Sequence, residues 1–200
     1  MASLQLGIPE LKDRARAIRR RIIAMNAAAG QGHTGADLSE TDILTALYFR
    51  VLDCAPDRTD EVERDHFILS KGHGAGGYYC ALAEAGYFPE AELKGYLGFD
   101  TMLPGHPVRG KTPGAEFSTG ALGHGLAVSA GLALSLKKAG SAGRVFALLG
   151  DGELQEGSNW EAAMAASRFG LGNLVAIVDR NGLQLADRTE SVMPLEPHAD

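Results

Sequence analysis

The chain has 200 residues, 45% of them hydrophobic and 22% charged, and it carries a net charge of −6. This length is enough for one hydrophobic core and too short for two ordinary domains, so we expect residues 1–200 to form one domain. The acidic balance argues against a nucleic-acid-binding surface, and no apolar run reaches a membrane-spanning length. Two cysteines without metal-type spacing and no visible secretory segment predict a cytoplasmic protein.

The first quarter of the sequence predicts two helices joined by a glycine-rich loop. Apolar residues at helical spacing follow Pro9 and stop at Gly30, which predicts one helix. Residues 30–35, GQGHTG, contain three glycines, so this stretch is expected to leave regular secondary structure and to present His33 to a ligand. The pattern SETD, starting at Ser39, is that of a capping box and predicts a second helix through Leu52.

The middle of the sequence predicts a short strand, helices and a long irregular connection. Residues 67–69, FIL, predict a buried strand, and the turn SKGHG then carries His73 into a helix over residues 76–85. Residues 103–114 form an irregular connection that contains His106, and long connections in compact domains are usually functional. The stretch STGALGHG, residues 118–125, is expected to open a helix of small residues.

Residues 145–178 predict a βαβ unit. Residues 145–149 and 174–178 are continuous apolar runs with β-branched residues, typical of parallel strands that are covered on both faces. Helix formers over residues 157–169 separate the two runs, as in a crossover connection. We therefore expect an α/β fold, with a doubly wound, mostly parallel sheet and helices on both faces.

Polar residues follow both of these strands. Asp151 lies in a Gly-Asp-Gly turn after the first strand and Asn181 follows the second, so both are expected at the carboxyl edge of the sheet, where ligands bind. Carboxylate and amide oxygens suit Mg²⁺, and Gly152 lets a backbone N–H approach a phosphate closely. The pattern predicts a site for a metal-bridged diphosphate. A simpler alternative is that Asp151 only caps the following helix.

Histidines recur at the predicted turns. Four of the six histidines directly follow a glycine, whereas the glycine content predicts about one such pair by chance. Turns of this kind allow the backbone to approach a ligand closely, so we interpret these positions as ligand-facing. They are His33, His73, His106 and His124.

The sequence resembles the thiamine diphosphate enzymes in its GDG motif, which 28 residues separate from Asn181. Five further stretches, GQGHTG, FILSKGH, LPGHP, STGALGHG and IVDRNGLQL, occur in the order and spacing of one family within that group. Together with GDGELQEG they make the chain similar, over nearly its whole length, to the N-terminal, pyrophosphate-binding part of transketolase.

The resemblance implies a role for each matched residue. It implies Mg²⁺ or Ca²⁺ at Asp151, Asn181 and the carbonyl of Leu183. It implies that the diphosphate contacts Gly152 and His73, and the cofactor rings contact Gly120 and Leu122. His33 and His106 line the substrate channel, and Glu156 belongs to a proton network between paired active sites; its alternative role is that of an acid favoured by the helix dipole.

The resemblance also implies a partner chain. The pyrimidine-binding half of transketolase is absent from these 200 residues, so we expect the N-terminal subunit of a split transketolase, joined by a separate pyrimidine-binding subunit in a heterotetramer of two pairs. Its substrates are expected to be sugar phosphates. Ala121, His124 and Thr34 depart from the common family pattern and leave the sugar open. The resembling region continues for several tens of residues past Asp200, so we expect the domain to be incomplete at its C-terminus or completed by the partner.

Two alternatives stay open. The GDG motif with its distant asparagine also occurs in the thiamine-dependent component of 2-oxo-acid dehydrogenases and in deoxyxylulose-phosphate synthase, although the Gly-His turns favour transketolase. The second alternative is a non-catalytic regulatory subunit. Its mark is the loss of Asp151, Asn181 or the Gly-His turns, and all of them are present.

Overall fold

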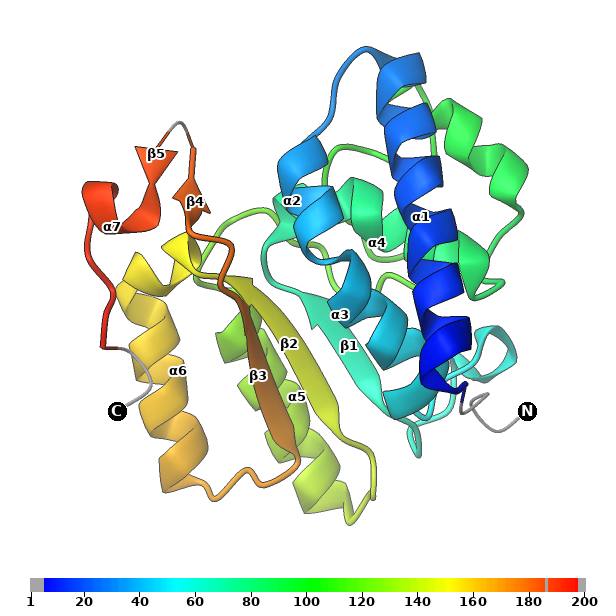
Figure 1. Cartoon of the computed structure of the whole chain (residues 1–200). Coiled ribbons are helices and arrows are strands. Elements are labelled where there is room, and N and C mark those ends of the chain that lie inside the picture. Colours follow the sequence, from blue (N-terminus) through cyan, green and yellow to red (C-terminus); the bar gives the residue numbers. More distant parts are fainter. Residues whose placement is uncertain (1–5, 186, 198–200) are drawn as a thin grey trace.

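The computed structural model describes residues 6–185 and 187–197, and its centre is a three-stranded parallel sheet between two groups of helices (Figure 1). The strands are β1 (His66–Leu69), β2 (Val145–Gly150), β3 (Leu174–Asp179), β4 (Leu183–Gln184) and β5 (Asp187–Arg188). The α-helices are α1 (Ile8–Ala29), α2 (Thr34–Ser39), α3 (Thr41–Ala46), α4 (Ala75–Glu84), α5 (Gly125–Ala139), α6 (Gly157–Arg168) and α7 (Thr189–Val192). The other helical segments are the π-helix η1 (Leu47–Val51) and the 3₁₀ helices η2 (Pro56–Arg58), η3 (Gly72–Gly74), η4 (Glu90–Gly95) and η5 (Gly152–Gln155).

In the central sheet the strands lie in the order β1-β2-β3 and are parallel, whereas β4 and β5 pair antiparallel with each other. His66 pairs with Val145, and Val145 pairs with Leu174, so the three strands end at one edge. This arrangement confirms the expected α/β sheet and the crossover between β2 and β3. The predicted strands and the α1, α4, α5 and α6 helices are also confirmed, with boundaries that differ by one or two residues.

Side chains of the strands alternate between two cores, as the period of a strand requires. Phe146 and Leu148 pack with the first group of helices, which includes α1, α3 and α4. Ala147 and Leu149 point to the other face and pack with α5 and α6. Helices therefore cover both faces of the sheet, with α1 to α4 on one side and α5 and α6 on the other (Figure 1).

The capping box predicted at Ser39 is wrong. A helix already begins at Thr34, directly after His33, and Ser39 is its last residue. The Ser39 hydroxyl does not cap α3; it donates to Asp179 Oδ1 at 2.6 Å. Ser39 still belongs to α2 and Glu40 directly precedes α3, so the Ser39 hydroxyl does not stand at the capping position of α3.

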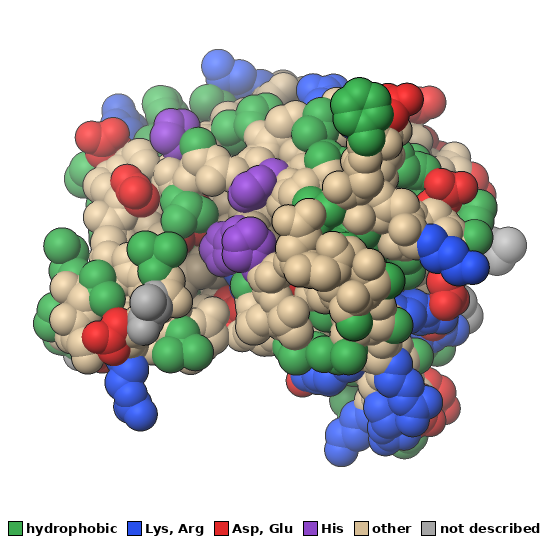
Figure 2. Space-filling view, turned by 90° about the horizontal axis from the view of Figure 1, so that it is seen from above, with side chains coloured by type: hydrophobic (Ala, Val, Ile, Leu, Met, Phe, Trp, Pro, Cys, Tyr) green, Lys and Arg blue, Asp and Glu red, His purple; other side chains and the backbone are tan. Residues whose placement is uncertain are grey.

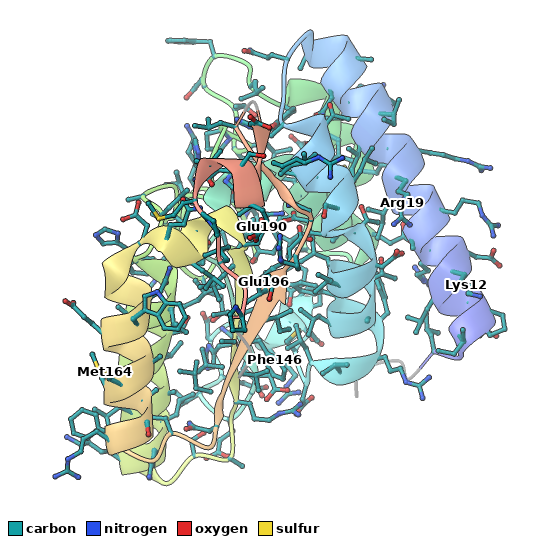
Figure 3. All side chains as sticks on the ribbon, turned by 60° about the vertical axis from the view of Figure 1, so that its left-hand side comes forward. Lys12, Arg19, Phe146, Met164, Glu190 and Glu196 are labelled. Atoms are coloured by element: carbon teal, nitrogen blue, oxygen red, sulfur yellow. The ribbon has the colours of Figure 1, made fainter. Side chains whose placement is uncertain are left out.

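The prediction that both long apolar runs are covered on both faces holds for β2 and is wrong for β3. All six residues of β2 are buried, whereas Val175 in β3 is 36% exposed. On the neighbouring α6, Trp160 is 49% and Met164 66% exposed, and Met164 points away from the sheet (Figure 3). Within the described residues β3 is the last strand of the sheet, so its outer side has no strand beside it.

None of the described helices combines the length and apolar character that a membrane-crossing helix needs.

Candidate active site

Three of the predicted histidines meet at the carboxyl edge of the sheet. His33 precedes α2, His73 lies in η3 between β1 and α4, and His106 lies in the loop before α5. The His33 ring lies 5.8 Å from the His73 ring and 6.4 Å from the His106 ring, measured between centroids. Figure 2 looks down on this edge and shows histidine side chains gathered near the middle of the face. Stretches far apart in the sequence thus form one cluster.

The environment favours neutral rings at two of these histidines, His73 and His106. Burial lowers the pKa of His73 to about 4, and the positive charge of Lys71 and the neighbouring histidines act in the same direction. Burial, followed by the proximity of His33, also lowers the pKa of His106. Near pH 7 these two rings can therefore each offer one N–H donor and one acceptor.

His124, the fourth Gly-His residue, lies directly before α5. Its side chain is exposed, with Nδ1 at 3.1 Å from the carbonyl oxygen of Leu122. The structure therefore gives it a local backbone contact.

A buried ion cluster lies behind the histidines. Lys71 is fully buried, and its Nζ lies 2.7 Å from Asp179 Oδ2 and 3.1 Å from Glu40 Oε2. Burial acts to lower the pKa of Lys71, but attraction to Glu40 and Asp179 outweighs it and the pKa is raised. Burial raises the pKa of Glu40 to about 8. The contact between Lys71 and Asp179 ties the turn after β1 to the end of β3.

Glu153 joins the same turns from another direction. This buried carboxylate accepts hydrogen bonds from Ser70 Oγ after β1, and from the backbone N–H groups of Gly123 and Gly150, both at 3.0 Å. Neither Glu153 nor the members of the Lys71 cluster were among the residues predicted for the site. In the sequence each of these residues is visible only as a charged residue near the end of a predicted element, and this position does not reveal which residue it pairs with.

Gly120, the first glycine of the STGALGHG stretch, is required by packing as well as by backbone geometry. Gly120 has φ +141°, and a Cβ there would lie 2.9 Å from His106 Cδ2. A side chain at this position would displace the His106 ring. Gly120 and the half-buried Leu122 thus lie beside the histidine cluster, and their predicted contacts with the cofactor rings remain predictions.

Asp151 is buried and heavily hydrogen-bonded. Its Oδ2 accepts from Arg180 Nη1 at 2.8 Å, from Gly182 N at 2.8 Å and from Thr189 Oγ1 at 3.0 Å. Its Oδ1 accepts from Gly152 N at 2.9 Å. Burial acts to raise the pKa of Asp151, but these hydrogen bonds outweigh it and the pKa is lowered. The carboxylate is therefore ionised near neutral pH.

The capping alternative for Asp151 is partly confirmed. The Oδ1 contact caps η5, the turn Gly152–Gln155, whereas α6 begins only at Gly157. Glu156 directly precedes α6, and its exposed side chain makes no capping hydrogen bond there. A Cβ at Gly123 would lie 2.6 Å from Glu156 Cβ, so Glu156 packs against the turn before α5.

The predicted metal ligands come from two neighbouring turns, Asp151 after β2 and Asn181 with Leu183 after β3, and their donor set fits a hard cation. Asn181 Oδ1 accepts from Leu183 N at 2.9 Å, and the Gly182 N–H between them contacts Asp151. Among the described residues no group of three or more histidine, cysteine, aspartate or glutamate side chains could hold a metal. A cation here would therefore take one carboxylate, one amide and one carbonyl oxygen, and complete its shell with water and phosphate, as Mg²⁺ prefers.

The family described as transketolase, thiamine diphosphate binding domain, matches residues 12–196. The chain belongs to this family. It is 56% identical to one of the subunits of the apulose-4-phosphate transketolase of Actinobacillus succinogenes, over 98% of this chain and 72% of that protein. It is 39% identical to 6-deoxy-6-sulfo-D-fructose transketolase subunit SqwG of a Clostridium species over 96% of this chain and 70% of that protein.

Solved structures agree with the sequence comparison. The transketolase of Pichia stipitis in complex with sedoheptulose-7-phosphate superposes with a TM-score of 0.89 and 33% identity, over 94% of this chain and 29% of that one. These findings confirm the expected fold and the interpretation of the chain as the thiamine diphosphate-binding subunit of a split transketolase. They favour transketolase over the 2-oxo-acid dehydrogenase, deoxyxylulose-phosphate synthase and regulatory alternatives.

Proposed function

We propose that this chain holds the diphosphate of thiamine diphosphate together with Mg²⁺ or Ca²⁺, and that with its partner subunit it transfers a two-carbon ketol group from a ketose phosphate to an aldose. The observation that carries the proposal is that the histidine cluster and the predicted metal ligands lie at the same edge of the sheet. The cluster of His33, His73 and His106 and the oxygen donors that follow β2 and β3 lie at one edge of the sheet. In open α/β sheets this edge is where ligands bind.

One set of residues at this site binds the cation and the diphosphate. Bound thiamine diphosphate supplies the nucleophilic carbon and the electron sink for carbon–carbon bond cleavage. Asp151, Asn181 and the Leu183 carbonyl hold the cation. The Gly152 N–H donates to the diphosphate, and a neutral His73 donates an N–H to it without adding charge.

The remaining site residues orient the reactants and move protons. The Gly120 carbonyl and Leu122 contact the cofactor rings. His33 and His106 bind sugar hydroxyls and transfer their protons, because a ring near neutrality can both accept and donate. Glu156 joins a proton network between the two sites of the assembly.

The relatives suggest which sugar to test first. The relative at 56% identity is named for apulose-4-phosphate and the one at 39% for 6-deoxy-6-sulfo-D-fructose. We therefore place apulose-4-phosphate first, the sulfonated sugar second and unbranched ketose phosphates third. Ala121, His124 and Thr34 depart from the common family pattern, so we propose to mutate these positions first to test which donor and acceptor sugars the enzyme prefers.

The proposed partner is a separate pyrimidine-binding subunit, with two copies of each chain in the assembly. Both relatives are named as single subunits of a transketolase, which supports a second, different chain. The transketolase of Homo sapiens supports a partner too, since this chain corresponds to only 29% of that single longer chain. The free cysteines Cys54 and Cys80 support a cytoplasmic location, where thiols stay reduced.

The test is native mass spectrometry of the chain purified gently from its source, with thiamine diphosphate and Mg²⁺ added. We expect a complex with a second, different polypeptide and one cofactor per pair of chains, and ketol transfer from a ketose phosphate to an aldose. Decarboxylation of pyruvate without ketol transfer from any sugar would contradict the proposed reaction. If Asp151→Ala leaves metal-dependent cofactor binding unchanged in the complex, the site assignment is overturned.

A further inference from the structure

Arg180, between the buried Asp179 and the predicted metal ligand Asn181, contacts three carboxylates. Its Nη1 lies 2.8 Å from Asp151 Oδ2, its Nη2 lies 2.7 Å from Glu190 Oε1, and its Nε lies 3.1 Å from Glu196 Oε1. Glu190 and Glu196 lie close together beside the end of β3 (Figure 3). One guanidinium therefore ties the segment after β4 to the carboxylate of the predicted metal site.

The two oxygens of Asp151 have different surroundings. Oδ2 receives three donors, from Arg180, Gly182 and Thr189. Oδ1 receives the N–H of the adjacent Gly152. A carboxylate oxygen offers about two lone pairs, so three donors saturate Oδ2, whereas Oδ1 keeps acceptor capacity. Oδ1 is the oxygen that can coordinate a cation.

An arginine beside a cation site has an electrostatic disadvantage. The guanidinium repels a divalent ion across a few ångströms, which by itself weakens metal binding. Glu190 and Glu196 offset that charge by pairing with the other nitrogens of Arg180. The arrangement therefore makes sense as an orienting device, because metal ligands depend on outer hydrogen bonds for their direction.

We propose that Arg180, held by Glu190 and Glu196 and assisted by Thr189, is a positioning residue that turns Asp151 so that Oδ1 faces the metal. Thr189, Glu190 and Glu196 thereby become part of the metal site, although the two glutamates do not coordinate the ion. This inference rests on the proposed function for the presence of the metal, and adds how the chain sets its affinity.

The experiment is a titration of the assembled enzyme with Mn²⁺ at saturating thiamine diphosphate, with free Mn²⁺ measured by electron paramagnetic resonance. For Arg180→Gln we expect Mn²⁺ binding to be about 10-fold weaker or more, the usual result when an outer partner of a metal ligand is lost. If the variant only removed the repulsion between the guanidinium and Mn²⁺, the ion would bind more tightly. Unchanged or tighter binding by Arg180→Gln overturns the inference.

A second variant removes a donor without changing any charge. Thr189→Val loses the hydroxyl that donates to Asp151 Oδ2, and we expect Mn²⁺ binding to weaken about several-fold. Thermal unfolding without metal shows whether Arg180→Gln folds. If it does not fold, Thr189→Val alone tests whether the donors to Asp151 Oδ2 affect metal binding. Wild-type affinity in Thr189→Val would then overturn the inference.

The matched control is Arg188→Gln, which removes one positive charge from the exposed β5 in the same segment. Its Mn²⁺ affinity is expected to stay within about twofold of wild type, since exposed charges are screened by solvent and salt. A loss as large as that of Arg180→Gln would overturn the specific role of Arg180. If the wild-type complex itself binds no Mn²⁺, the proposed function fails; if wild type binds and the variants match it, only this inference fails.

Discussion

Two neighbouring residues at the end of β3 form ion pairs of opposite character. Asp179 points into the protein and pairs with Lys71, whose side chain is 0% exposed. Arg180 points the other way and pairs with Asp151, Glu190 and Glu196, and its side chain is 31% exposed. Asp179 is the last residue of β3 and Arg180 directly follows it, so the end of one strand supplies both clusters.

The difference in burial separates two roles. Breaking a buried pair leaves an uncompensated charge in the protein interior, whereas an exposed pair is screened by water and contributes little to stability. We therefore expect the Lys71 cluster to hold the turns that carry His73 and Asn181 together. In the Arg180 cluster, by contrast, the pairs with Glu190 and Glu196 are exposed and add little stability, so their main effect is to hold Arg180 against the buried Asp151.

The largest expected effect is that of Lys71→Met. It leaves Asp179 buried without its cation, and we expect the free energy of unfolding to fall by about 3–5 kcal/mol. Urea unfolding measures this change, with Lys94→Met on the exposed side of η4 as the matched control. A loss below about 1 kcal/mol, no larger than that of an exposed pair, would remove the contrast between the two clusters.

A smaller effect is expected from the pH dependence of His73, which lies beside Lys71. Its pKa of about 4 in the folded chain is below the ordinary 6.5, mainly because of burial. Between these values the unfolded chain binds a proton that the folded chain does not. Stability from this group is therefore complete above about pH 6.5 and is lost as the pH falls towards about 4.

The comparison of wild type with His73→Gln isolates this contribution. Between pH 7 and pH 4.5 we expect wild type to lose roughly 1–2 kcal/mol more than the variant, after allowance for solvent around a partly exposed ring. Urea unfolding at the two pH values provides the measurement. Equal pH dependence in both proteins would show that His73 does not carry the depressed pKa.

The fold was predictable because its signals are local. The buried runs of β1 and β2, the apolar spacing of α1 and its ending at Gly30 each specify an element without reference to the rest of the chain. The exposure of β3 was not predictable in this way. A continuous apolar run has the same pattern whether its neighbour belongs to this chain or lies elsewhere.

The site was predictable in part, for a related reason. Asp151, Asn181 and the Gly-His turns stand at the ends of predicted strands and helices, so their common edge follows from topology. The Lys71–Asp179 pair spans 108 residues and the Ser39–Asp179 contact spans 140, and no local pattern encodes such partners. The prediction of a capping box at Ser39 failed because α2 extends through Ser39 and leaves Glu40 as the residue before α3.

The smallest expected effect tests the exposed cluster directly. Glu190→Gln removes one charge from Arg180's partners, and we expect Tm to fall by no more than about 4 °C, less at high salt because exposed pairs are screened. Thermal unfolding at low and high salt provides the measurement, with the exposed Glu92→Gln as the matched control. A fall in Tm comparable with that of Lys71→Met would mean that the Arg180 cluster is as structural as the buried one. A small, salt-sensitive fall in Tm would show that Glu190 contributes little to stability. Its main effect would then be on metal binding, because it holds Arg180 against Asp151.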